Sequence, residues 1–385
     1  MELNKNLSKI KPSGIRKLFD LAQNRADLVS FGIGEPDFIT PDHVREAAKQ
    51  AIDDGYTHYT PNAGFYDLRE ALAHKLNEIN GISVKTEEVI VTAGGTQALF
   101  SSFYALLNPG DELIVPDPGF LVYGSQVLLA GGNPVYLPLR EENKFQLDPV
   151  ELKKLITPRT RAILLNSPSN PTGMLLGEEV LKEIAKIAND YDLFIISDEM
   201  YEDIIFDGLK HVSIASFPGM KERTISVFGF SKSYAMTGWR LAYLALPERL
   251  ANEMIKIQQN TAVCPNSVTQ RAALYGLQQE EETKLAIENM RRAYQERRDI
   301  LVKGLNEIKG FHCLTPEGAF YAFPSFSQGM PSRDMARKLV ASGVICAPGT
   351  AFGEMGENHL RFSYAASEEN ISKGLAIVKR VVEGL

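Results

Sequence analysis

Short apolar runs alternate with amphipathic segments over residues 46–280, and this alternation constrains the fold more than any other feature of the chain. The runs are almost continuously apolar, as expected of strands that are covered on both faces. The segments between them, such as residues 177–189, carry apolar residues at helical spacing. The pattern predicts an α/β fold with a mostly parallel sheet covered by helices. The apolar runs are residues 88–92, 112–115, 162–165 and 193–197.

The chain changes character after residue 280. A long charged helical stretch over residues 281–308 is followed by short strand-like runs and two further helical segments. We therefore expect a large domain over residues 46–280 and a smaller α+β domain over residues 281–385. The expected strands of the smaller domain are residues 311–314, 319–323 and 360–364, and the expected helices are residues 332–342 and 368–382.

Composition argues against several other classes of protein. With 385 residues, 44% of them hydrophobic, the chain can bury a sizeable core. The formal net charge is −7 and no basic block is present, so no nucleic-acid partner is indicated. We find neither an export signal nor an apolar run of membrane-spanning length, and we expect a cytoplasmic protein. The three cysteines and six histidines are scattered, which indicates neither a disulfide framework nor a metal site.

Lys232 lies in the run Ser-Lys-Ser-Tyr-Ala-Met-Thr-Gly-Trp-Arg, which begins at Ser231 and ends at Arg240. A lysine among small and apolar residues loses its proton easily and can attack an aldehyde. The run resembles the lysine signature of the fold-type I, pyridoxal-phosphate (PLP) dependent aminotransferases of class I and II. The resemblance, which covers essentially the whole chain, implies that Lys232 carries PLP and that Arg240 and Ser231 contact its phosphate. It also implies that residues 1–45 form an N-terminal arm and part of the small domain.

Asp198 follows the apolar run 193–197, at the carboxyl end of an expected strand, where α/β sheets form their sites. A carboxylate at this position can hold a pyridine nitrogen protonated, although a helix cap is the ordinary alternative. The stretch resembles the family's Asp-x-x-Tyr motif, which implies that role for Asp198 and a hydrogen bond from Tyr201 to the ring oxygen of PLP. Asn170 matches the asparagine of the family's Asn-Pro-x-Gly motif, which contacts the same oxygen. Lys232, Asp198 and Tyr201 are thus the expected catalytic residues.

Glycines at the start of an amphipathic helix suit a phosphate, because backbone amides and the helix dipole both favour an anion there. In the family this position cradles the PLP phosphate, which implies the same role for Gly94, Gly95 and Thr96. Phe120 aligns with an aromatic residue that stacks on the cofactor ring. Tyr59 matches a tyrosine that reaches the phosphate of the partner subunit, and this match implies a homodimer with shared active sites.

The α-carboxylate of an amino-acid substrate calls for a cation with two donors. Arg361 is the single charge within the strand-like run 360–364 and resembles the late arginine with which the family grips this carboxylate. Gly34 matches a backbone position near the same carboxylate, where glycine permits a close approach. The substrate-binding residues implied by the resemblance are Gly34, Asn170 and Arg361.

Together these residues predict an aminotransferase that moves an amino group between an L-amino acid, aspartate or aromatic, and 2-oxoglutarate by a ping-pong mechanism. The run that ends at Arg240 is most similar to aspartate and aromatic aminotransferases of the bacterial and archaeal branch. Cofactor residues do not fix the reaction, so a PLP-dependent C–S lyase or an aminocyclopropane-carboxylate synthase-like enzyme is the alternative. A non-catalytic, effector-sensing domain is a remote alternative.

Overall fold

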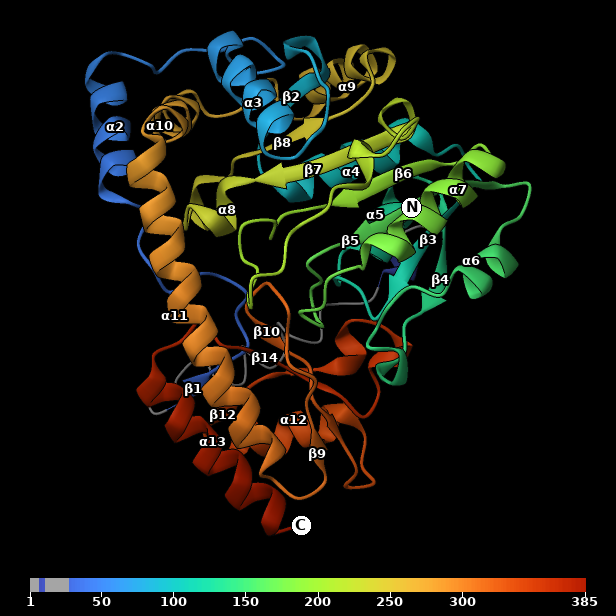
Figure 1. Cartoon of the computed structure of the whole chain (residues 1–385), viewed down its shortest axis with the longest axis vertical. Coiled ribbons are helices and arrows are strands. Elements are labelled where there is room, and N and C mark those ends of the chain that lie inside the picture. The colour runs from blue at the N-terminus through green and yellow to red at the C-terminus, as the bar shows by residue number, and fades with distance from the viewer. Residues whose placement is uncertain (1–6, 11–27) are drawn as a thin grey trace, which may run out of the picture.

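The computed structural model describes residues 7–10 and 28–385 (Figure 1). The remaining part of the expected N-terminal arm, residues 1–6 and 11–27, lies outside the described residues. A seven-stranded sheet with strand order β2-β8-β7-β6-β5-β3-β4 forms the centre of the larger part of the molecule. Its strands are β2 (Val89–Thr92), β3 (Glu112–Asp117), β4 (Asn133–Pro138), β5 (Thr160–Asn166), β6 (Phe194–Asp198), β7 (Thr224–Gly229) and β8 (Ala242–Ala245).

The large sheet is mostly parallel, as the apolar runs predict. Only β8 runs antiparallel to its two neighbours, β2 and β7. The register pairs Asn166 at the end of β5 with Asp198 at the end of β6. Because the carboxyl ends of parallel strands meet at one edge of a sheet, the side chains that follow these strands are brought together there.

Helices cover both faces of the large sheet (Figure 1). Ile163 and Leu165 of β5 pack in one core with α7, whereas Leu164 packs in another core with α4 and α9. This alternation explains why β5 is apolar at nearly every position. The helices around this sheet are α2 (Asp42–Asp53), α3 (Tyr66–Glu78), α4 (Gly95–Leu106), α5 (Tyr123–Leu129), α6 (Pro149–Leu155), α7 (Glu178–Asp190), α8 (Phe230–Ser233), α9 (Glu248–Thr261) and α10 (Ser267–Gln278).

Among the described residues, a second part of the molecule contains small sheets and three α-helices. In one small sheet β10 (Tyr321–Ala322), β14 (Leu360–Ser363) and β13 (Ala347–Pro348) lie side by side. The other small sheets pair β9 (Phe311–His312) with β11 (Ser325–Phe326) and β1 (Val29–Ser30) with β12 (Val344–Ile345). The helices of this part are α11 (Glu280–Asn306), α12 (Ser332–Ala341) and α13 (Glu368–Glu383).

The described residues around β1 join this second part. Val29 and Phe31 belong to the same hydrophobic core as α11 and α13, and β1 pairs in parallel with β12. Helix α11 runs from the large sheet toward the small sheets (Figure 1). On this basis we propose the division into residues 1–45, 46–280 and 281–385, in which Val29 and Phe31 of the first segment pack onto the last, whereas residues 42–45 begin α2 beside the large sheet. The expected strands at 311–314 and 319–323 are present in shorter form.

Candidate active site

A cavity of about 370 Å³ lies between the two parts of the molecule. One side, the large-sheet wall, comes from segments at or after the ends of large-sheet strands and includes Gly95, Thr96, Phe120, Asp198 and Ser231. The opposite side, the small-sheet wall, includes Gly32, Gly34, Tyr321 and Arg361. Every residue predicted for the site lines this cavity except Gly94 and Tyr59. The others on the cavity are Asn170, Tyr201, Lys232 and Arg240.

Asp198 is buried at the end of β6 and is held from several directions. The Tyr123 hydroxyl donates a hydrogen bond of 2.7 Å to Oδ2, and the Met200 N–H donates one of 3.3 Å to Oδ1. The Asn166 amide, from the neighbouring strand, donates to the Asp198 carbonyl at 3.0 Å. Burial raises the pKa of the Asp198 carboxyl to about 6, although the hydrogen bonds from Tyr123 and Met200 favour the charged form. Because this carboxylate is desolvated, a cation that binds beside it would stabilise its charged form.

Lys232 bridges the two walls. It lies on the short helix α8, directly after β7, and its Nζ donates a hydrogen bond of 2.6 Å to the Gly34 carbonyl oxygen. Burial, together with the positive charges of Arg361 and Arg240, lowers the pKa of this amine to about 8. The carboxylates of Glu35 and Asp198 oppose that effect. A lysine in this state is partly neutral near pH 8 and can act as a nucleophile or a base.

The start of α4 faces the guanidinium of Arg240. Gly94, the residue before α4, has φ +89°, and a Cβ built on it would lie 2.5 Å from Nη2 of Arg240. Any larger residue at Gly94 would displace the arginine. Nη1 of Arg240 donates to the Thr237 carbonyl at 2.9 Å. Gly94 does not line the cavity but leaves room for the Arg240 side chain, whereas Gly95, Thr96 and Ser231 lie on the lining itself.

Arg361 is a buried cation without a carboxylate partner among the described residues. Its guanidinium donates 3.0 Å and 2.7 Å hydrogen bonds to the Asn170 side-chain oxygen and the Gly32 carbonyl oxygen, which are both neutral. The rings of Tyr321 and Phe352 lie 4.5 Å and 4.8 Å from its central carbon. Burial lowers the pKa of Arg361. Because a buried charge is costly until it is paired, the cavity presents a site ready for an anion.

Tyr201 and Tyr321 join the two walls through their hydroxyl groups, which lie 2.8 Å apart. Gly34 lies against the same group, since a Cβ on Gly34 would collide with the Tyr321 hydroxyl. Phe120 exposes its ring to the cavity and contacts Tyr123 edge-on, with the ring centroids 5.6 Å apart. Tyr59 lies away from the cavity and is 86% exposed.

Several side chains of the site were given no role in the sequence analysis. Tyr123 holds Asp198, and its position three residues after Phe120 was the available signal for it. Asn166 could have been found as the polar residue that ends the apolar run of β5. Tyr321 lies in a short strand within a hydrophobic segment, and nothing in the local sequence distinguishes it from a core residue.

The comparisons with known proteins agree with this geometry. Residues 26–378 match the family described as aminotransferase class I and II. The chain is 44% identical to aromatic-amino-acid aminotransferase 2 of Thermococcus litoralis, covering 100% of this chain and 99% of the relative. It is 45% identical to aspartate aminotransferase of Pyrococcus abyssi, covering 99% of this chain and 98% of the relative.

Comparison of structures leads to the same family. A structure of Thermus thermophilus aspartate aminotransferase with maleate superposes with a TM-score of 0.95 at 40% identity, covering 99% of this chain and 100% of that one. The chain therefore belongs to the class I and II aminotransferases, enzymes of fold type I that generally use PLP. This result confirms the predicted family and fold class, and it argues against the non-catalytic alternative.

The described part of the chain shows neither a membrane-spanning helix nor a metal-binding cluster. Within residues 7–10 and 28–385, no helix is both long and apolar enough to cross a membrane. Over the same ranges, no group of three or more histidine, cysteine, aspartate or glutamate side chains is arranged to hold a metal ion.

Proposed function

We propose that the protein is a PLP-dependent aminotransferase that moves an amino group between an L-amino acid, aspartate or aromatic, and 2-oxoglutarate by a ping-pong mechanism. One observation carries the proposal. The desolvated amine of Lys232 shares a cavity of about 370 Å³ with a buried carboxylate, Asp198, and with a buried cation, Arg361, that has neutral hydrogen-bond partners. These are the groups that a ring nitrogen, a reacting carbon and a substrate carboxylate require.

The residues present fit PLP. Its phosphate would be held at the start of α4 by Gly95 and Thr96, with Arg240 and Ser231 adding donors. The ring nitrogen would meet Asp198, and the ring oxygen would meet Tyr201 and Asn170. Phe120 would stack on the ring face. When bound, PLP supplies an electron sink that stabilises negative charge at the substrate α-carbon.

In the proposed mechanism, the residues of the chain position the reactants and move one proton. Lys232 would hold the cofactor, and its free amine would act as the base that takes the proton from the substrate α-carbon and later gives it up. This role requires a neutral amine, which the lowered pKa near 8 makes accessible. Asp198 must be charged, and its raised pKa of about 6 leaves it ionised at neutral pH. Its ionisation favours a protonated ring nitrogen.

Arg361 would hold the α-carboxylate of every substrate. Its hydrogen bonds to Asn170 and Gly32 fix the plane of the guanidinium before the substrate arrives, which lowers the ordering cost of binding. Specificity for the side chain must come from other residues. Since the relatives compared above are named as aspartate and aromatic aminotransferases, we propose glutamate with either aspartate or an aromatic amino acid as the working pair.

A panel of amino donors assayed with 2-oxoglutarate tests the substrate assignment. We expect aspartate or an aromatic amino acid to give glutamate, with parallel lines in double-reciprocal plots as a ping-pong mechanism requires. The substrate assignment fails if neither glutamate nor 2-oxoglutarate reacts at millimolar concentration while alanine or a sulfur amino acid does. Release of ammonia and a thiol from a sulfur amino acid would instead favour the C–S lyase alternative.

We further propose a cytoplasmic homodimer in which Tyr59 reaches the phosphate site of the neighbouring subunit. The exposed position of Tyr59, away from the cavity of its own chain, supports this proposal. Mixing Tyr59→Ala chains with Lys232→Ala chains should form hybrid dimers that contain one intact site, so activity should reappear from two nearly inactive proteins. Absence of recovery, with subunit exchange verified by mass, would count against a shared site.

A further inference from the structure

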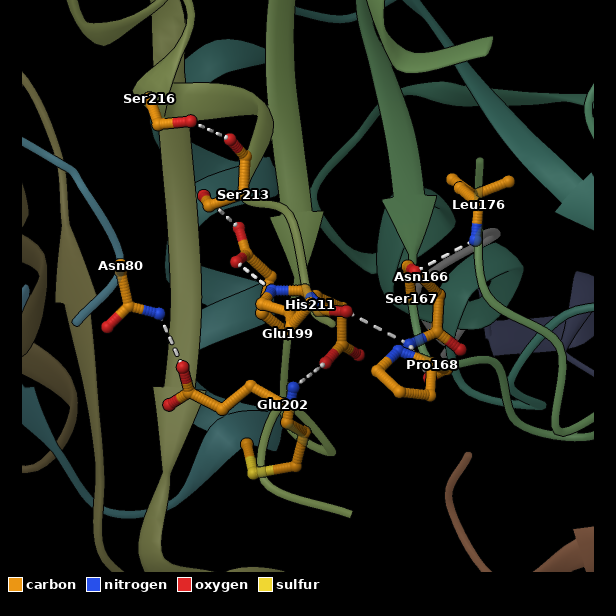
Figure 2. Close-up of polar contacts among 12 residues, drawn as sticks. Asn80, Asn166, Ser167, Pro168, Leu176, Glu199, Glu202, His211, Ser213 and Ser216 are labelled. Atoms are coloured by element: carbon orange, nitrogen blue, oxygen red, sulfur yellow. Dashed lines mark hydrogen bonds and ion pairs between the residues drawn. The ribbon is translucent and has the colours of Figure 1, made fainter. Parts of the chain in front are cut away.

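A buried ion pair anchors the turn that follows Asp198. The Glu199 side chain is 1% exposed, and its Oε2 lies 2.6 Å from Nε2 of His211, whose side chain is 10% exposed. The Ser213 hydroxyl donates to Oε1 of Glu199 at 2.9 Å. Figure 2 shows His211 and Ser213 beside Glu199, on a loop that returns to the end of the large sheet. Both oxygens of this carboxylate are therefore satisfied in the interior.

The proton on His211 is favoured by this pairing. Burial alone lowers the pKa of a histidine, but the hydrogen bond to Glu199 and the negative charges of Glu199 and Glu202 outweigh burial and raise the pKa of His211. A protonated His211 makes the pair neutral as a unit. This neutrality matters because the desolvation free energy of a buried, unpaired charge is much larger than that of a buried ion pair.

Other charged groups surround the pair and Asp198. Lys75 of α3 lies near His211 and forms an ion pair with Glu202, so these two charges largely offset each other. Asp203 on the same turn is a further carboxylate facing His211, and burial raises its pKa. On the cavity side, the groups that face Asp198 are the Tyr201 and Tyr123 hydroxyls and the Lys232 amine.

Glu199 is coupled to Asp198 by charge and by backbone. Its negative charge disfavours ionisation of the neighbouring Asp198. Its N–H donates to the Val227 carbonyl at 2.9 Å and its carbonyl accepts from the Glu202 N–H at 3.1 Å, which fixes the turn. Within that turn the Met200 N–H points at the Asp198 carboxylate. A substitution at Glu199 should therefore alter both the charge near the Asp198 carboxylate and the position of the Met200 N–H that donates to it.

We propose that His211 and Glu199 form a charge-balanced positioning pair, in which the His211 cation neutralises Glu199 and thereby keeps Asp198 ionised for the ring nitrogen of PLP. Neither residue lines the cavity, so they act through Asp198 and are not catalytic residues. This inference rests on the proposed function, because it needs a cofactor nitrogen at Asp198.

The test is the pH dependence of PLP affinity, measured by absorbance titration of the full-length chain after removal of cofactor. His211→Gln keeps a hydrogen-bond donor but loses the cation, so the pH at which affinity falls to half should rise by about one unit. In the double variant with Glu199→Gln, both charges are absent and the midpoint should return close to that of the wild type. Glu199→Gln alone should produce no rise. The protonation of PLP itself is common to all variants and cancels in the comparison.

A purely structural role would give a different pattern. Loosening of the turn would weaken affinity at every pH in both single variants, with no restoration in the double variant, and that result would overturn the inference. If His211→Gln does not fold, Glu199→Asp takes its place, since it keeps the charge but draws it away from His211. No upward shift in Glu199→Asp would equally overturn the inference. Absence of PLP binding to the wild type would instead refute the proposed function.

Discussion

The two walls of the cavity are built in different ways. The large-sheet wall consists of short segments that each begin or end at a strand of one rigid sheet, so Asp198 is placed by its own strand and by its neighbour β5. The small-sheet wall is assembled from the residues after β1, from β10 and from β14, which are far apart in the sequence. Lys232, like Tyr201, belongs to the large-sheet wall and contacts the small-sheet wall, in its case through the hydrogen bond to Gly34.

This difference matches the ligand proposed for each wall, which is the cofactor for the large-sheet wall and the substrate for the small-sheet wall. A cofactor that stays bound through many turnovers is best held by a preorganised surface, and the large sheet supplies one. A substrate that enters and leaves at each turnover is met by Arg361, whose partners are neutral atoms that can share or release the guanidinium. Substitutions should therefore separate cofactor defects from substrate defects according to the wall that they affect.

Removal of Lys232 should have the largest effect on turnover, because this residue is proposed both to hold the cofactor and to move the proton. Lys232→Ala loses the base that moves the proton as well as the covalent hold on the cofactor, and we expect a loss of turnover of about a thousandfold or more. PLP can still bind without a covalent bond. Steady-state assays with Lys182→Ala, an exposed lysine of α7, provide the matched control. Wild-type turnover in Lys232→Ala would show that the lysine is misassigned.

A change at Asp198 should affect only the large-sheet wall. Asp198→Ala removes the charge that keeps the ring nitrogen protonated, and proton abstraction should slow by a factor equivalent to ~3 kcal/mol or more. The affinity for the amino acid should change much less. Single-turnover kinetics with saturating PLP would measure the effect, with Asp190→Ala at the end of α7 as control. A decrease below threefold would rule out this role.

A change at Arg361 should act mainly on the small-sheet wall, although it also removes the hydrogen bond to Asn170. Arg361→Ala loses a charged contact worth roughly 1.5–3 kcal/mol, so every donor should bind about ten- to a hundredfold more weakly. PLP affinity should remain close to that of the wild type. Donor titrations of the holoenzyme measure this, and Arg337→Ala, an exposed arginine paired with Asp334, is the control. Selective loss of one donor class would contradict an α-carboxylate role.

The smallest predicted effect concerns the free energy of unfolding, and here the substitution improves the measured property where the others impair it. Since burial raises the pKa of Asp198 from 3.8 to about 6, its ionised form destabilises the ligand-free chain above that pH. Asp198→Asn should therefore stabilise this state by about 1–3 kcal/mol at pH 7. The gain should shrink as pH falls from about 6 toward 4. Thermal unfolding at several pH values measures it, and a destabilised variant at pH 7 would contradict the account.

Much of the large-sheet part could be predicted because its strands and site residues are specified by short, contiguous stretches of sequence. The strands β2, β3, β5 and β6 appear as continuous apolar runs, since both faces of each are buried. Edge strand β4 has no such run, because it is partly exposed and carries two prolines. The residues of the large-sheet wall follow these strands within short motifs, which is why their positions could be expected.

The small-sheet wall was harder to predict because it depends on long-range contacts. Arg361 could be expected from its motif, but its partners at Gly32 and Tyr321 are brought to it only by folding. Tyr321 and Tyr123 resemble ordinary core aromatics in the sequence, and only their hydroxyl hydrogen bonds distinguish them. The Glu199–His211 pair likewise spans a loop whose path the sequence does not specify.

The most direct test of the central claim is a half-reaction of the PLP-loaded enzyme with glutamate alone. If Lys232, Asp198 and Arg361 act on one substrate in one cavity, each active site should release a single equivalent of 2-oxoglutarate, retain the amino group and release no ammonia. Adding a second oxo acid should then discharge that amino group as a new amino acid. Continuous release of ammonia, or the absence of any oxo acid from glutamate, aspartate and aromatic donors alike, would contradict the account.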